Sequence, residues 1–237
     1  MSKVREKDFI CGDCMKFLPD FPNKYFDVAI VDPPYFSGPE KRAFYGRRIS
    51  PIGVQRLYKT SEQWDIPQKE YFDQLFRVSK NQIIWGGNYF HYEFPAGRIV
   101  WDKCNENSCF SDCEIAVCSF HDSVRLFRYM WNGMMQGKNI EHGDIQQGNK
   151  KLNEKRIHPT QKPVNLYRWI CQKYLQKGMK VLDTHVGSAS SLIAYEEYGL
   201  EYVGYEINED YYNAACKRLK EFRSQLTLFD MGMEVPE

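Results

Sequence analysis

The segment Val181–Ile207, VLDTHVGSASSLIAYEEYGLEYVGYEI, decides the fold class. A short apolar strand at 180–183 leads into a loop of small residues, and a helix follows to about Tyr198. Gly199 then stops that helix, because glycine readily adopts the left-handed conformation of a helix end. A second apolar strand follows at once, at 201–207. This order of strand, helix and strand is typical of a parallel-sheet unit.

The same alternation extends outward through the chain. Asn208 is expected to cap a last helix whose buried stripe is Tyr211, Ala215, Leu219 and Phe222. Further strands are expected at 25–31, 82–86, 99–101, 113–120 and 124–130, and further helices at 68–79 and 163–176. A short turn at 121–123 joins the last two strands. We therefore expect a doubly wound α/β fold with a mostly parallel sheet and an antiparallel strand pair at one edge.

Composition sets the outer limits. The chain has 237 residues, 43% of them hydrophobic and 27% charged, which suits one globular domain and excludes wholesale disorder. The net charge of +1 excludes a uniformly basic protein. The N-terminus lacks an apolar signal-peptide core, and no apolar run is long enough to span a membrane, so we expect a cytoplasmic protein without membrane contact.

The eight cysteines are expected to be free thiols rather than a disulfide framework. Four of them, Cys104, Cys109, Cys113 and Cys118, are close in sequence. Their spacings fit no common zinc site, so no metal is expected.

Asp32-Pro33-Pro34-Tyr35 follows directly on the apolar strand 25–31. In open α/β sheets, ligands bind at the carboxyl ends of the strands. Two prolines have no N–H donors and hold their carbonyls rigidly, and the aspartate adds a carboxylate acceptor. The tyrosine adds a flat face for stacking. Together these groups suit a planar substrate with an –NH2 group, whose two N–H bonds would be accepted there; the alternative is a plain strand-ending turn.

Two other segments carry polar groups to the same strand ends. The small-residue loop at 183–190 lets a ligand approach the backbone, and Glu206 closes the next strand, where a carboxylate can accept hydrogen bonds from ribose hydroxyls. The glycine fingerprint G-x-G-x-x-G is absent, which disfavours a nicotinamide dehydrogenase. His158–Pro163, HPTQKP, is either a polar loop before a helix or a place where Thr160 and Lys162 meet a carboxylate.

Taken in order, DPPY, HPTQKP, DxxxGS and an acidic strand end resemble the β class of amino-group DNA methyltransferases, over most of residues 8–222. The resemblance implies a Rossmann-like methyltransferase fold. It also implies methyl transfer from S-adenosylmethionine to adenine N6, or to cytosine N4, in a flipped-out base. In this class the catalytic half precedes the cofactor half. We therefore expect a methyltransferase domain at 1–224, with a catalytic half at about 8–101, a target-recognition insertion at about 102–157 and a cofactor half at about 158–224. Residues 225–237 form a tail.

The resemblance also assigns roles to individual residues. Asp32, Pro33, Pro34 and Tyr35 are expected to be catalytic. The cofactor is expected to contact Asp13, Cys14, Thr160, Lys162, Asp183, His185, Gly187, Ser188 and Glu206. The loop departs from the family pattern, Asp-Pro-Phe-x-Gly-Ser-Gly, at Thr184, His185 and Ala189. These departures motivate an alternative, a catalytically degenerate DNA-binding module, beside the two enzymatic readings.

Basic residues gather in two segments beside these motifs, which favours contact with DNA phosphates over an ordinary solvated surface. They are Lys41, Arg42, Arg47, Arg48, Arg56 and Lys59 in the first, and Lys150, Lys151, Lys155 and Arg156 in the second. The partner is therefore expected to be double-stranded DNA. Gln225–Phe229, QLTLF, resembles the peptide by which bacterial DNA enzymes bind the sliding clamp, and packing of this peptide on its own domain is the alternative. The class also often forms homodimers.

Asp rather than Ser before Pro-Pro-Tyr favours adenine over cytosine within this family. An RNA methyltransferase is disfavoured by the order of the two halves. The sequence therefore predicts a DNA adenine-N6 methyltransferase, with cytosine N4 as the alternative target.

Overall fold

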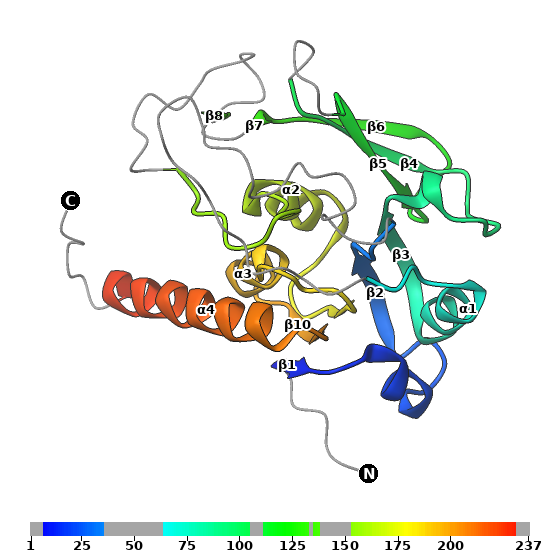
Figure 1. Ribbon diagram of the computed structural model, residues 1–237, viewed down its shortest axis with the longest axis horizontal. Helices are drawn as coiled ribbons and strands as arrows, with labels where there is room; N and C mark the ends of the chain where they lie inside the picture. Colours follow the sequence, from blue (N-terminus) through cyan, green and yellow to red (C-terminus); the bar gives the residue numbers. More distant parts are fainter. Residues whose placement is uncertain (1–6, 36–63, 105–110, 133–134, 138–152, 231–237) are drawn as a thin grey trace.

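The computed structural model describes residues 7–35, 64–104, 111–132, 135–137 and 153–230 (Figure 1). Its main sheet has the strand order β1-β10-β9-β2-β3-β5-β4-β6. The strands are β1 Lys7–Cys11, β2 Phe26–Val31, β3 Ser79–Trp85, β4 Arg98–Asp102, β5 Cys113–Cys118, β6 Val124–Arg128, β9 Lys180–Asp183 and β10 Glu201–Glu206. A separate antiparallel ribbon pairs β7 Trp131–Asn132 with β8 Met135–Gln136.

Helices cover both faces of this sheet (Figure 1). The α-helices are α1 Lys69–Val78, α2 Val164–Tyr174, α3 Ser190–Glu197 and α4 Glu209–Asp230, and three short 3₁₀ turns are η1 Cys14–Lys16, η2 Leu18–Asp20 and η4 Gly87–Tyr89. Five neighbouring strands, β1, β10, β9, β2 and β3, are parallel. The expected α/β fold with a mostly parallel sheet is therefore confirmed.

The far edge of the sheet differs in one detail from the expectation. The turn at 121–123 does not join two paired strands, because β4 lies between β5 and β6 and pairs with both. Burial explains this order. Ala116, Val117 and Cys118 of β5 are fully buried, so β5 needs a neighbour on each side, β3 and β4. In β6 only Phe127 is fully buried, which suits the outermost strand.

Alternate residues of the central strands feed two separate cores. Val28 and Ile30 of β2 pack into the cluster formed with α2, α3 and α4. Ala29 and Val31 face the opposite cluster, which contains α1 and the 3₁₀ turns. A strand buried on both faces is typical of a doubly wound sheet, and the carboxyl end of β2 is thereby fixed in the middle of the molecule.

The end of α3 at Gly199 and the start of α4 at Asn208 lie where the sequence predicts them. Gly199, with φ of +65°, follows α3. The side chain of Asn208 accepts a hydrogen bond from the backbone N–H of Tyr211 at 3.1 Å, which confirms the cap of α4. The expected stripe is confirmed too, because Ala215 and Leu219 are buried and Phe222 packs against the core. Within the described part of the chain, no helix combines the length and apolar character needed to cross a membrane.

Candidate active site

A cavity of about 620 Å³ opens at the carboxyl ends of the central strands. β2 and β9 are neighbours in the sheet, so the segments that follow them meet there. Twelve of the thirteen residues expected at the catalytic and cofactor sites line it: Asp13, Cys14, Asp32, Pro33, Pro34, Tyr35, Thr160, Lys162, His185, Gly187, Ser188 and Glu206. The thirteenth, Asp183, is not among the lining residues.

A chain of alternating charges ends at Asp32. Nζ of Lys162 lies 2.6 Å from Oδ2 of Asp32 and 3.0 Å from Oε2 of Glu114. Nζ of Lys103, in turn, lies 2.5 Å from Oε1 of Glu114. The side chain of Lys162 is only 3% exposed, so its ammonium group is shielded from water and contacts these two carboxylates instead. Lys162 lines the cavity, as expected for a cofactor contact, and the structure also brings its ammonium to the DPPY carboxylate.

Burial and charge act in opposite directions in this chain. Burial raises the pKa of Asp32, and the Lys162 ammonium opposes that rise. Burial alone would lower the pKa of Lys162, but the carboxylates of Asp32 and Glu114 outweigh it and raise this pKa. Burial likewise opposes ionisation of Glu114, yet Lys162 and Lys103 lower its pKa to about 2. Lys162 is therefore a permanent cation beside Asp32 at neutral pH.

Tyr35 lies flat against a second tyrosine. Its ring stacks on that of Tyr89, with centroids 4.7 Å apart and planes within 7°. Gly86 makes this packing possible, because a Cβ there would lie 2.3 Å from Cδ1 of Tyr35, and its φ is +69°. Tyr35 also lines the cavity, and an aromatic ring there can stack on a planar group. No local motif marks Tyr89, which lies in the short turn η4 after β3.

The expected ribose acceptor, Glu206, lies on the opposite wall. Its two carboxylate oxygens accept hydrogen bonds from the backbone N–H groups of Gly187 at 2.8 Å and Asn208 at 2.9 Å. These bonds join the end of β10 to the loop at 184–189 between β9 and α3, which we call the β9–α3 loop. Asp13 caps η1 by accepting a hydrogen bond from the N–H of Met15 at 2.9 Å. Both carboxylates line the cavity.

Asp183 supports the β9–α3 loop from beneath. It accepts hydrogen bonds from the N–H of His185 at 3.1 Å and the hydroxyl of Ser191 at 2.6 Å. Burial raises its pKa to about 7. The structure thus gives Asp183 a supporting position rather than one on the cavity wall.

Two of the three departures from the family pattern, Thr184 and His185, contact Tyr71 of α1. The Thr184 hydroxyl lies 2.6 Å from the Tyr71 hydroxyl and 2.9 Å from Nδ1 of His185. The His185 ring meets Tyr71 edge-on, with centroids 5.6 Å apart. Burial lowers the pKa of His185 to about 4, so the imidazole is neutral at neutral pH.

The start of the HPTQKP segment adds an aromatic wall. His158 stacks on Trp64, with centroids 5.9 Å apart, and meets Tyr211 edge-on at 4.3 Å. The Thr160 hydroxyl lies 3.2 Å from Nδ1 of His158, so Thr160 orients this ring. Burial lowers the pKa of His158 to about 3.

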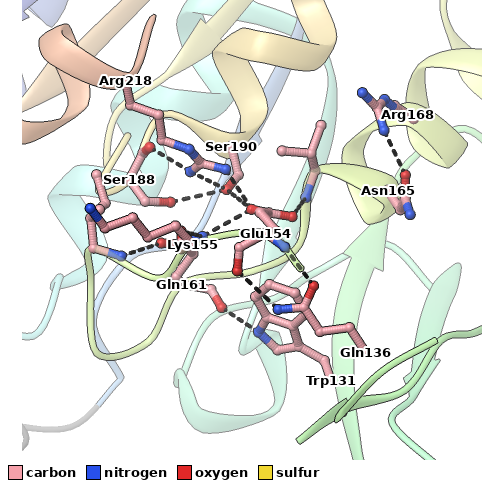
Figure 2. A network of polar contacts seen from close by, with 12 residues as sticks. Trp131, Gln136, Glu154, Lys155, Gln161, Asn165, Arg168, Ser188, Ser190 and Arg218 are labelled. Carbon is pink, nitrogen blue, oxygen red and sulfur yellow. Dashed lines mark hydrogen bonds and ion pairs between the residues drawn. The ribbon is translucent and has the colours of Figure 1, made fainter. Parts of the chain in front are cut away.

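Figure 2 shows a polar network that centres on Glu154. Glu154 contacts Gln161, Ser190 and Arg218, and Arg218 in turn contacts Ser188. In the sequence, Glu154 stands among basic residues and no local motif marks it. The contacts that give it a position join segments far apart in the chain.

Eight of the ten expected DNA-contacting residues lie outside the described part of the chain: Lys41, Arg42, Arg47, Arg48, Arg56, Lys59, Lys150 and Lys151. Lys155 is described and exposed. The Arg156 guanidinium packs over the Trp131 ring, 4.4 Å from its centroid, and donates a hydrogen bond to the Trp131 carbonyl. Arg156 thus packs on Trp131, and phosphate contact by Lys155 and by Arg156 stays a prediction.

Comparisons with known proteins agree with this geometry. The chain is 26% identical to the type II methyltransferase M2.MboI of Moraxella bovis, over 89% of this chain and 86% of that protein. Its fold resembles the crystal structure of M1.HpyAVI with S-adenosylmethionine (TM-score 0.52, 18% identity, 89% of this chain and 98% of that one). It also resembles the cytosine-N4-specific PvuII DNA methyltransferase (TM-score 0.53, 13% identity, 94% of this chain and 93% of that one).

A family model described as DNA methylase, for N6 and N4 methyltransferases, matches residues 55–217, more than half of the chain. The match includes the HPTQKP segment, the β9–α3 loop and Glu206, which meet at the cavity. The chain therefore belongs to the N6/N4 family of DNA methylases.

Proposed function

We propose that this DNA methylase transfers the methyl group of S-adenosylmethionine to the N6 amino group of a flipped-out adenine. The observation that carries the proposal is the Asp32–Lys162 pair, which sets a carboxylate acceptor beside Tyr35 in a cavity of about 620 Å³. Cytosine N4 is the alternative target, and a degenerate DNA-binding module is the alternative from another class.

The cavity suits S-adenosylmethionine in size and in its polar groups. Its volume is in the range of pockets that hold ligands of this size. Glu206 and Asp13 offer carboxylate acceptors for the ribose and the adenine. Gly187 has φ of +57°, and a Cβ there would meet nothing closer than 3.8 Å, so a ligand can approach the backbone. The cofactor supplies an electrophilic methyl group when bound.

The chain's own residues prepare the attacking amino group. Lys162 occupies Oδ2 of Asp32, and within the described part of the chain Oδ1 accepts no hydrogen bond from protein groups. Oδ1 and the Pro33 carbonyl are the two acceptors for the N–H bonds of the base. Holding both N–H bonds exposes the nitrogen lone pair for in-line attack. Positioning and fixed charges then supply most of the rate.

The target base must leave the duplex to reach this depth, because its amino group is otherwise paired. Tyr35, braced by Tyr89, offers the stacking face that compensates for lost base stacking. Asp at position 32, rather than Ser, favours adenine within the family that the motifs resemble.

Two measurements on the purified full-length chain test the proposal. Calorimetry with S-adenosylmethionine separates an enzyme from a degenerate module, which would bind none. Mass spectrometry of nucleosides, after incubation with unmethylated genomic DNA, separates the targets. We expect N6-methyladenine. N4-methylcytosine alone would contradict the adenine target and support the cytosine alternative.

We also propose three points about the partners and the organisation of the chain. These are binding of Gln225–Phe229 to the sliding clamp, homodimer formation, and the division into catalytic half, insertion, cofactor half and tail. α4 continues through Asp230, so the backbone of 225–229 is helical in this structure. A pull-down with the clamp, repeated after Leu228 and Phe229 are changed to Ala, tests the first.

A further inference from the structure

Glu154 joins four segments through its side chain (Figure 2). Its Oε1 accepts hydrogen bonds from Gln161 Nε2 at 2.9 Å, the Ser190 hydroxyl at 3.2 Å and the Arg218 guanidinium at 2.5 Å. Its Oε2 accepts one from the backbone N–H of Val164 at 3.0 Å. One carboxylate therefore ties together the HPTQKP turn, the start of α2, the start of α3 and the middle of α4.

Arg218 extends this grip to the β9–α3 loop. Its NH1 donates to the Ser188 carbonyl at 2.8 Å and to the Ser190 hydroxyl at 2.9 Å. Ser188 and Ser190 line the cavity, whereas Glu154 and Arg218 do not. Arg218 can therefore act on a ligand in the cavity through the loop, and Glu154 can act through Arg218 and through Gln161, which also lines the cavity.

The backbone of Ala189, between Ser188 and Ser190, is strained. Ala189 has φ of +61°, in the left-handed region that a residue with a Cβ rarely adopts. A strained backbone persists where surrounding contacts hold it. Arg218 forms hydrogen bonds on both sides of Ala189, with Ser188 and with Ser190. Glu154 holds Arg218 through an ion pair that is largely buried, since the Glu154 side chain is 20% exposed and the Arg218 side chain 14% exposed.

The backbone of Glu154 is anchored separately. Its N–H donates to Oε1 of Gln136 at 2.8 Å, and its carbonyl accepts from Nε2 of Gln136 at 2.9 Å. Gln136 ends the β7–β8 ribbon. The indole N–H of Trp131, which pairs with Gln136 in that ribbon, donates to the Gln161 carbonyl at 2.8 Å. The ribbon thus holds Glu154 in place against the loop.

We propose that Glu154, acting through Arg218, is a positioning residue that holds the β9–α3 loop in the left-handed conformation that receives the cofactor. The identity of that cofactor, S-adenosylmethionine, rests on the proposed function. The conformation of the loop itself does not, so the two can be tested apart.

The test uses the full-length chain with the variants E154Q, R218M and R218K. R168M is the matched control, because Arg168 forms an ion pair with Glu197 at 2.5 Å and also donates to Asn165 of α2, whereas Arg218 donates to Ser188 of the β9–α3 loop. Hydrogen exchange of the peptide covering 186–192 is measured without ligand. Affinities for S-adenosylmethionine and for DNA are measured by calorimetry and fluorescence anisotropy.

We expect faster exchange of that peptide in E154Q and R218M, and affinity for S-adenosylmethionine weakened about tenfold, as for the loss of a hydrogen bond to a charged group. DNA affinity is unchanged, R218K is intermediate, and R168M matches the wild type. Adding A189G to R218M restores most of the lost affinity, since glycine adopts the left-handed conformation without strain. This rescue would not follow from a general loss of stability.

Each outcome has a separate meaning. Wild-type exchange and wild-type affinity in both E154Q and R218M would overturn the inference and leave the proposed function intact. Equal loss of S-adenosylmethionine and DNA binding without rescue by A189G would also overturn it, because the Glu154–Arg218 pair would then be a general structural contact. If the loop exchanges faster in the variants but the wild type binds no S-adenosylmethionine, the loop role is supported and the proposed function is contradicted. If E154Q does not fold, R218M and A189G/R218M decide the matter.

Discussion

Nζ of Lys162 lies 2.6 Å from Oδ2 of Asp32, at the end of a buried chain of charges that continues to Glu114. Lys162 comes from the turn before α2 and Asp32 from the end of β2, so the ion pair joins the two halves of the molecule. A buried carboxylate without a cation would favour its protonated form. The ammonium therefore keeps Asp32 available as an acceptor.

Replacing Lys162 with Met should shift the pH dependence of catalysis. Burial and the Glu114 carboxylate both raise the pKa of Asp32, and Lys162 opposes them together with the more distant Lys103. Without Lys162 the pKa of Asp32 rises, so the acid limb of kcat moves to higher pH. At neutral pH we expect a loss of about 100-fold. Rates of methyl transfer across pH check this.

The matched control for K162M is K173M, because Lys173 is an exposed lysine of α2 that packs over Trp169. It should show the wild-type profile. An unshifted acid limb in K162M, with reduced rate only, would mean that Lys162 acts by packing and not through the charge of Asp32.

Changing Gly86 to Ala should displace Tyr35. The new Cβ would lie 2.3 Å from Cδ1 of that ring, in addition to the strain of φ +69°. We expect kcat to fall at least about tenfold while affinity for S-adenosylmethionine stays near the wild-type value. G178A separates the two effects, because Gly178 has φ of +82° and nothing within 4 Å of a Cβ. It should cost about 1 kcal/mol of stability and leave kcat unchanged. Equal kcat in G86A and the wild type would remove Tyr35 from the account.

Asp183 should make the protein less stable as the pH rises towards neutrality. Its folded-state pKa of about 7 lies above the ordinary 3.8, so the folded chain binds this proton more tightly than the unfolded chain. The resulting stabilisation is complete below about pH 3.8 and is lost as the pH rises to about 7. The total is about 4 kcal/mol.

D183N, which is neutral throughout, should lack this contribution. Denaturant unfolding of both proteins at several pH values gives the comparison. The wild type should lose free energy of unfolding relative to D183N between about pH 4 and pH 7. A constant difference would show that Asp183 is ionised in the folded protein.

DNA affinity should be modest and sensitive to salt. The expected contacts come from basic residues beside the two motifs, and each phosphate contact releases counterions on binding. Anisotropy with duplex DNA should show at least about a tenfold loss of affinity between low and physiological salt. Affinity that does not change with salt would contradict phosphate contact as the main source of binding.

Local signals predicted much of this fold. The cap at Asn208, the stop at Gly199 and the strand end at Asp32 depend on neighbouring residues, and each lies where the sequence indicates. The position of β4 between β5 and β6 depends on pairing across the sheet. Alternation along each strand does not encode which neighbours it will have.

The site shows the same division. DPPY and HPTQKP are recognisable because their chemistry lies within a few consecutive residues. Glu114, Tyr89 and Glu154 carry no such local pattern. Glu154, for example, meets Arg218 across 64 positions of the chain. Contacts of this kind become visible only when the fold brings the segments together.

The central claim is that Asp32, held by Lys162, prepares an adenine amino group for methylation. Expression in a host that lacks DNA methylation, followed by methylation-sensitive sequencing of the host DNA, tests it most directly. The account predicts N6-methyladenine at a defined sequence with the wild-type chain, and none with a folded D32A variant that still binds S-adenosylmethionine. Unmodified DNA from a host with soluble wild-type protein, or equal methylation by D32A, would contradict it.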